Sequence, residues 1–426
     1  MIFENSFAFA KEKDNEDVLK SFRDRFYFPI VNGKQAIYFT GNSLGLQPKT
    51  TQDYVLKELE DWATFGVEGH FHARNPWMPY HEMFAAPLSK IVGAKPNEVV
   101  AMNQLTVNLH LLMVSFYRPT AKRFKILCEA KAFPSDQYAL ESQVKFHGFR
   151  YEEAVVEVEP RAGEYNIRHE DIISKINELG EELALVMIGG VNYFTGQVFD
   201  MKSITVAAHQ VGAYAGFDLA HAAGNIQLAL HEWQVDFACW CSYKYMNSGP
   251  GGVSGVYIHE KHASDPNLPR FAGWWGHDKN TRFKMEKGFK PMDTAEAWQL
   301  SNAPVLSMAA HKASLDIFDE AGMERLCQKS EVLTSYLEFL IEDINATKLF
   351  NDAHKLEIIT PRNKAQRGCQ LSIVAHGRGR ELFNKLSENG IIADWREPNV
   401  IRVAPVPLYN SFEDCFRFAE ILKTII

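Results

Sequence analysis

Lys244 and Asp218 are the residues whose types and surroundings best suit covalent chemistry with an aldehyde cofactor. Lys244 follows a strand-like run, FACWCS, and precedes the glycine-rich turn NSGPGG. In α/β proteins the loops after parallel strands build the binding site, so a lysine there is placed to form a Schiff base. A lone lysine is usually a solvated loop residue, and this interpretation therefore depends on the neighbouring motifs.

The motif around Asp218 is the first of these neighbours. An apolar run, AYAGF, delivers Asp218 at its end, and His221 follows where we expect the next helix to begin. A carboxylate against a pyridinium nitrogen keeps the ring protonated, as the electron sink of pyridoxal 5′-phosphate (PLP) requires. By itself the motif is more typical of a helix N-cap, but beside Lys244 the cofactor interpretation is favoured.

Two further motifs suit the same cofactor. In AKAFPSDQYAL, Phe133 can stack on a ring, and Ser135 and Asp136 can start a helix. In MNQLTVNLHLL, Thr106 opens an apolar helix whose free amide groups can receive a phosphate. Taken alone, the first is a common turn and the second a simple helix cap.

Other motifs exclude competing chemistries. His70 and His72 lack a third metal ligand at a recognisable spacing, so we expect no metal site. The glycine-rich GPGGVSG lacks the lysine and hydroxyl of a phosphate-binding P-loop, and no GxSxG motif offers a serine nucleophile.

The elements that must position these residues read as an α/β protein. Between Phe124 and Ile258 the apolar runs FKILC, VVEV, LALVMI, YAGF, FACWC and VSGVYI alternate with helix-length polar stretches, which predicts a mainly parallel sheet. The segment from Thr50 to Phe65 predicts an amphipathic helix with Leu59 and Trp62 on one face.

Toward the C-terminus the pattern changes. SEVLTSYLEFLIEDI spaces four apolar residues as a helix stripe, and LEII, CQLSIVA and VIRV then read as strands. We therefore predict three parts: an N-terminal segment packed on the body (1–50), a large α/β domain (51–310) and a small α+β domain (311–426).

The composition indicates which classes of partner and which cellular compartment to expect for this chain. The 426 residues carry a net charge of −8, so there is no basic excess for nucleic acid. No apolar run approaches the roughly 20 residues that span a bilayer, and the N-terminus lacks the features of a secretory signal. Six scattered cysteines form no CxxC pair. We expect a reduced, cytoplasmic protein that binds neither nucleic acid nor membrane.

The order and spacing of several blocks resemble the kynureninase family. The resemblance runs from GNSLGL at Gly41 through LTVN, FPSD, GFDLAHAAGN, CWCSYKY, GWWGH and SNAP to IRVAPVPLYNSF. It implies the fold type I architecture of PLP enzymes: a seven-stranded α/β domain, a small C-terminal domain and a homodimer with active sites between subunits. The implied reaction is hydrolysis of the Cβ–Cγ bond of the amino acid L-kynurenine, or 3-hydroxykynurenine, to L-alanine and the corresponding anthranilate.

The resemblance also implies roles for individual residues. Lys244 would be the Schiff-base lysine and proton-transfer base, with Tyr243 as a proton relay. The cofactor would contact Leu105, Thr106, Phe133, Pro134, Ser135, Asp136, Asp218, His221, Tyr243, Lys244, Trp274 and Asn302. The substrate would contact Asn42, Ser43, His70 or His72, Asn302 and Arg402, whose guanidinium would grip the α-carboxylate. Gly189 departs from the hydroxyl residue of some members, so a side-chain contact is lost there.

Three alternatives share parts of this machinery. Transamination and cysteine desulfuration would use the same Lys244 and Asp218. Desulfuration needs a mobile nucleophilic cysteine, whereas Cys239 and Cys241 alternate along a predicted buried strand. A non-catalytic homologue would be expected to have lost the lysine, the aspartate or Arg402, and all three are present.

Overall fold

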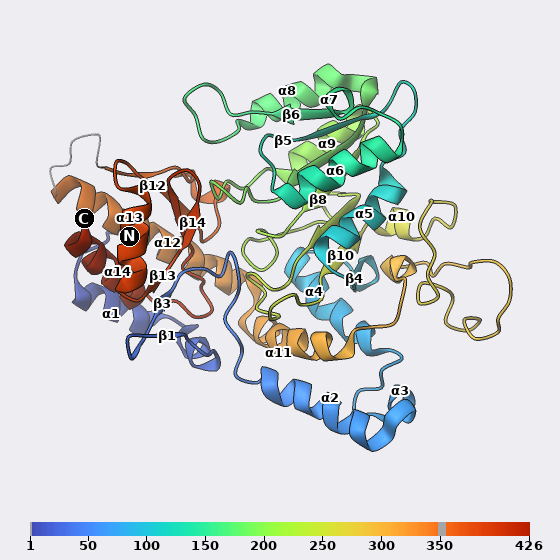
Figure 1. Cartoon of the computed structure of the whole chain (residues 1–426), viewed down its shortest axis with the longest axis horizontal. Coiled ribbons are helices and arrows are strands. Elements are labelled where there is room, and N and C mark those ends of the chain that lie inside the picture. The colour runs from blue at the N-terminus through green and yellow to red at the C-terminus, as the bar shows by residue number, and fades with distance from the viewer. Residues whose placement is uncertain (1, 348–354) are drawn as a thin grey trace.

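A seven-stranded sheet lies at the centre of the larger part of the molecule (Figure 1). The computed structural model describes residues 2–347 and 355–426. Neighbours pair in parallel from β9 to β6, and β10 runs antiparallel to β9 and β4. In sheet order the strands are β4 (Val99–Ala101), β10 (Gly255–Ile258), β9 (Phe237–Trp240), β8 (Tyr214–Asp218), β7 (Leu183–Gly189), β5 (Lys125–Glu129) and β6 (Val155–Val158). The predicted α/β class with a mainly parallel seven-stranded sheet is confirmed.

Helices cover both faces of this sheet. Along β7, Leu185 and Met187 join the core cluster of α5 and α6, whereas Val186 and Ile188 join the cluster of α8 and α9. Burial on both faces explains why the strands read as continuous apolar runs. The helices of this part are α3 (Gly69–His72), α4 (Ala85–Val92), α5 (Leu105–Phe116), α6 (Pro134–Phe146), α7 (Tyr151–Ala154), α8 (His169–Leu179), α9 (Met201–Gln210), α10 (Glu260–Ala263) and α11 (Val305–Ala321).

A second, antiparallel sheet forms the smaller part, in the order β11-β12-β15-β14. Its elements are β11 (Leu356–Ile358), β12 (Leu371–Ala375), β14 (Asp394–Arg396), β15 (Val400–Val403), α12 (Met323–Thr347), α13 (Gly379–Glu388) and α14 (Phe412–Ile425). The predicted helix stripe lies on α12, where Leu333, Leu337, Leu340 and Ile344 are all fully buried. Helix and strands therefore share one core, as the apolar periodicities predicted.

The N-terminal segment packs on this smaller part, so both termini lie on the same side of the molecule (Figure 1). Helix α1 (Phe7–Glu16) lies against α14, and β3 (Ile37–Tyr38) pairs in parallel with β13 (Ile391–Ile392). The segment between them forms the short hairpin of β1 (Ile30–Val31) and β2 (Lys34–Gln35). None of the helices in residues 2–347 and 355–426 is long and apolar enough to cross a membrane.

Helix α2 (Thr51–Phe65) confirms the predicted helix, but its apolar face points outward. Leu59 and Trp62 are exposed, and the buried side chains are Glu58 and Asp61. Glu58 accepts hydrogen bonds from Trp77 and from Tyr80, at 3.0 Å each. These bonds anchor the polar face of α2 to the body, which leaves its apolar face without a partner in the single chain.

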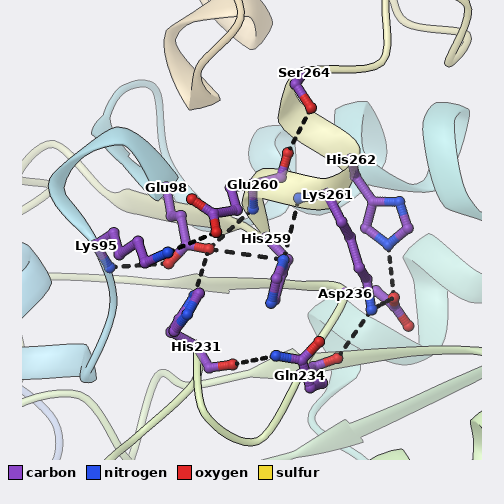
Figure 2. A network of polar contacts seen from close by, with 10 residues as sticks. All are labelled: Lys95, Glu98, His231, Gln234, Asp236, His259, Glu260, Lys261, His262 and Ser264. Carbon is purple, nitrogen blue, oxygen red and sulfur yellow. Dashed lines mark hydrogen bonds and ion pairs between the residues drawn. The ribbon is translucent and has the colours of Figure 1, made fainter.

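A charge network joins α10 to the ends of β9 and β10 (Figure 2). Asp236, 1% exposed, accepts hydrogen bonds from the Ala215 N–H at 2.8 Å, from His209 at 2.8 Å and from His262 at 2.6 Å. The Lys261 ammonium lies 3.0 Å away. These partners outweigh burial and hold the pKa of Asp236 well below its usual range.

Asp236→Asn should lower the free energy of unfolding at neutral pH by about 2 to 4 kcal/mol, because charge-assisted bonds to a buried carboxylate are lost. Folding lowers the pKa of Asp236, so its contribution is complete above the unfolded value of 3.8 and declines as pH falls below it. Urea unfolding between about pH 7 and pH 3 should show a shallower acid loss in the variant. Asp53→Asn, an exposed carboxyl on α2, is the control, and equal acid slopes in all three proteins would contradict the assignment.

Candidate functional site

A cavity of about 130 Å³ opens at the carboxyl ends of β5, β7 and β8. Binding sites of parallel α/β sheets lie at this edge, because the loops that follow the strands gather there. Nine of the predicted cofactor residues line the cavity: Leu105, Thr106, Phe133, Ser135, Asp136, Asp218, His221, Tyr243 and Lys244. The fold thus brings together predicted residues from four separate segments of the chain.

Lys244 is held in the cavity by the turn that follows β9. Its Nζ lies 3.0 Å from Nε2 of His221 and 5.8 Å from the centre of the Phe133 ring. Burial, together with the Lys244 charge, holds the pKa of His221 well below its usual value. The imidazole is therefore neutral and accepts a hydrogen bond from the lysine.

Asp218 and Asp136 form a hydrogen-bonded carboxyl pair beside the lysine. Burial raises the pKa of both groups, and the Asp218 charge raises that of Asp136 further. Asp136 also accepts a hydrogen bond from the Ser135 hydroxyl at 3.2 Å, and Asp218 accepts one from the Ala220 N–H at 2.7 Å. Each carboxyl of the pair is therefore easier to protonate than a carboxyl in water. The helix expected after Asp218 is absent, because residues 219–225 form a series of turns.

The first turn of α5 supplies unpaired amide groups to the same cavity. Leu105 and Thr106 begin the helix, and no side chain caps its N-terminus. An anion at that end would gain N–H donors and the favourable end of the helix dipole. An ammonium, a proton-sharing acid pair, a ring face and free helix amides together match the aldehyde, pyridine and phosphate groups of PLP.

Arg402 lies fully buried next to this cavity rather than on the surface of an edge strand. It sits on β15, between β12 and β14, and forks onto Asp394 at 2.8 and 3.2 Å. Its third nitrogen donates to the carbonyl oxygen of Tyr193 at 2.7 Å, and Tyr193 lines the cavity. Asn42 is also fully buried, with its amide donating to Gln370 at 2.8 Å.

Several predicted residues lie outside the cavity lining of the single chain. Pro134 begins α6 but does not line the cavity, and Ser43 is half-buried in the N-terminal loop. Four others lie on outer segments: His70 and His72 on α3, Trp274 in the long loop before residue 295, and the exposed Asn302. In the single chain none of these four side chains lines the cavity.

Sequence reasoning missed five lining residues, namely Glu129, Val191, Tyr193, Ala220 and Cys241. The sequence could have predicted Glu129 as a lining residue, because it ends the run FKILCE and so stands at the carboxyl end of a strand. The space beside Gly189 is filled by this glutamate, whose Oε1 lies 3.0 Å from where a Cβ on Gly189 would stand. A polar group from another strand therefore occupies the place of the lost side chain.

Comparison with known proteins gives the family. A family model described as "Kynureninase C-terminal domain" matches residues 326–422. A kynureninase of Flavobacterium psychrophilum is 62% identical, with 99% of each chain covered. The chain belongs to the kynureninase family. A kynureninase of Myxococcus xanthus is 55% identical over 99% of this chain and 98% of its own, and one of Nematostella vectensis is 48% identical over 97% and 93%.

Solved structures with the same fold are more distant than these kynureninases. The apo cysteine desulfurase of Thermococcus onnurineus has a TM-score of 0.72 at 17% identity, covering 92% of this chain and 94% of its own. A C-DES mutant with glycine covalently linked to its PLP cofactor has a TM-score of 0.71 at 18% identity, covering 91% and 96%. At such identities the likeness establishes the fold alone, which confirms the predicted fold type I class.

Gly45 is the point where the N-terminal loop meets the lysine turn. Its N–H donates to the Tyr243 carbonyl at 2.8 Å, and an added Cβ would overlap the Lys244 carbonyl and Asn247. Gly45→Ala should therefore cost about 2 kcal/mol or more of stability and displace the lysine.

Gly33→Ala in the same segment is the control for this change. An added Cβ there meets nothing within 4 Å, so only its positive φ of 75° costs energy, about 1 kcal/mol. Thermal unfolding with and without added PLP measures both effects. Equal stability losses in the two variants would contradict the role assigned to Gly45.

Proposed function

We propose that this chain hydrolyses the Cβ–Cγ bond of L-kynurenine or 3-hydroxykynurenine, giving L-alanine and the corresponding anthranilate with PLP as its cofactor. The observation that carries the proposal is the placement of Lys244 and the Asp136–Asp218 pair in one cavity of a kynureninase-family chain. When bound, PLP supplies an electron sink for the negative charge left by loss of the substrate α-proton.

In this proposal Lys244 anchors the cofactor and then acts as the base at the α-carbon. The neutral His221 Nε2 accepts a hydrogen bond from the ammonium, so it holds the lysine nitrogen in position between those two tasks. Tyr243, next in the chain and on the same cavity wall, is the proposed proton relay. Burial raises the pKa of its phenol, so it remains a proton donor throughout the neutral range.

The remaining walls orient the two reactants. The Asp136–Asp218 pair would hold the ring nitrogen, Phe133 would cover the ring, and the first turn of α5 would receive the phosphate. Arg402 is the proposed partner of the substrate α-carboxylate. Asp394 and the Tyr193 carbonyl fix its guanidinium beforehand, so little side-chain entropy is lost when the substrate binds.

We further propose that a second copy of the chain completes the site. The apolar face of α2 and the adjoining turn exposes Leu56, Leu59, Trp62, Phe65, Val67 and Phe71, which form an apolar surface that a monomer leaves in water. His70 lies beside Phe71 in this same region, and Trp274 is half-exposed on another outer loop. A homodimer would bury these side chains and bring Trp274, Asn302 and a histidine of α3 to the partner's cavity.

The wider setting follows from the proposed reaction. The substrate places the enzyme in tryptophan catabolism and NAD precursor synthesis, and six unpaired cysteines support a cytoplasmic location. The domain boundaries near residues 50 and 310 also belong to the proposal.

Cysteine desulfuration is a less suitable reaction for this site, because burial raises the pKa of the Cys239 and Cys241 thiols and leaves them without nucleophilic thiolate.

Lys244→Ala tests the catalytic proposal. The purified variant should lose both the visible absorbance of lysine-bound PLP and, by at least about a thousandfold, the formation of alanine from kynurenine and 3-hydroxykynurenine. Lys145→Ala, which removes an exposed lysine of α6, is the matched control. Wild-type rates in the Lys244 variant would refute the lysine's role, and absence of alanine with both substrates in the parent protein would refute the function.

Trp62→Glu tests the dimer. Sedimentation should show dimers for the parent protein and a shift toward monomers for the variant, because a buried charge opposes association. Val206→Glu makes the same change at an exposed apolar residue of α9 outside the proposed interface. The dimer proposal fails if the parent protein sediments as a monomer at micromolar concentration.

A further inference from the structure

Glu129 is a buried acid of the cofactor cavity to which the mechanism above gives no task. It ends β5, is 5% exposed, and lines the cavity together with Lys244 and Asp218. Both of its carboxyl oxygens lie 3.2 Å from the N–H of Gly189, the last residue of β7. Gly189 in turn pairs with Asp218 at the end of β8. One strand, β7, therefore separates Glu129 from Asp218, which is the proposed partner of the cofactor ring.

Gly189 is the reason that the carboxyl reaches this position. A Cβ at residue 189 would lie 3.0 Å from Glu129 Oε1 and 3.9 Å from the Asp218 carbonyl oxygen. A carbon and a carboxyl oxygen at 3.0 Å are tighter than ordinary van der Waals contact, so a larger side chain would displace the glutamate. The absence of a side chain at Gly189 therefore leaves the space that the Glu129 carboxyl occupies.

The charge around Glu129 is unusual for a buried acid. Within the described residues no lysine or arginine forms an ion pair with it, and its hydrogen-bond donors are backbone N–H groups. The ionisable groups that interact electrostatically with it are Asp218 of β8, Asp136 of α6, Glu157 of β6 and Cys128 of β5. Burial is the main cause that raises the pKa of Glu129 to about 7, and the charges of Asp218 and Glu157 add to it.

We propose, resting on the function proposed above, that Glu129 is a positioning residue: it fixes the end of β7 and supports the carboxyl pair that faces the cofactor ring. It acts on the ring through Asp136 and Asp218 and needs no contact with substrate. The electrostatic effect of Glu129 on the pair needs no intermediate residue, because a carboxyl near Asp136 and Asp218 disfavours a second negative charge on them. Glu129 accordingly adds to the rise in the pKa of Asp136 and helps the pair to keep its shared proton.

Glu129→Gln separates the electrostatic role from the structural one. The amide oxygen can still accept the Gly189 N–H, but the ionisable group is gone. The dissociation constant of PLP from apoprotein, measured from about pH 6 to pH 9, should show the inflection of the acid pair moved down by about one pH unit, as expected for loss of one charge near a buried pair. The absorbance of bound PLP should shift along the same pH axis.

Glu157→Gln is the matched control. It removes the same charge from the next strand, but its side chain is exposed and lies outside the cavity lining, so the inflection should stay in place. Gly189→Ala tests the structural half, because its Cβ displaces the carboxyl and should weaken PLP binding about tenfold without removing any ionisable group.

The possible outcomes separate this inference from the proposed function. An unchanged inflection in Glu129→Gln, with PLP bound and kynurenine turned over normally, overturns the inference and leaves the function standing. An equal shift in Glu157→Gln also overturns it, because the effect would then be long-range charge alone. If Glu129→Gln shows the predicted inflection shift but the parent protein binds PLP and releases no alanine, the inference is supported and the proposed reaction fails.

Discussion

The burial of a proton-sharing carboxyl pair beside a lysine is the constraint on which the rest of the site depends. Asp136 and Asp218 are removed from water and in contact, so a second negative charge between them is strongly disfavoured. The pair therefore carries one proton and one charge, and Lys244 in the same cavity provides the opposite charge. The neutral His221, in contact with Lys244, adds no charge of its own. The cavity is thus polarised before any ligand binds, and little reorganisation remains to be done.

Sheet topology is what brings these charges together. β5, β7 and β8 are neighbours in the sheet although long helices separate them in the chain, so Glu129, Gly189 and Asp218 end at one edge. The register of β7 on β8 sets Gly189 directly against Asp218. Because the strands are parallel, their last residues meet at the same edge and no side chain needs unusual reach. Gly189, which lies between the two acids in the sheet, has no side chain and so leaves room for the Glu129 carboxyl.

The smaller part of the molecule contributes through a single buried arginine. Arg402 comes from the second sheet, yet its guanidinium is fixed both by Asp394 of that sheet and by the Tyr193 carbonyl from a loop of the larger part. The N-terminal loop makes a similar link, since Gly45 packs without a side chain against the lysine turn. Contacts of this kind join the two parts next to the cavity.

The sequence by itself determined the elements, the family and most of the cavity. Continuous apolar runs predicted the strands from β5 to β10, because both faces of these strands are buried, and a helical periodicity predicted the buried stripe of α12. Distinctive blocks around Lys244, Asp218 and Phe133 pointed to residues that the structure places in one cavity. Local patterns could not predict that Glu129 would meet Gly189, that Asp136 would share a proton with Asp218, or that α2 would turn its apolar face outward. Those outcomes depend on contacts between residues far apart in the chain, and only the packing of the tertiary structure decides them.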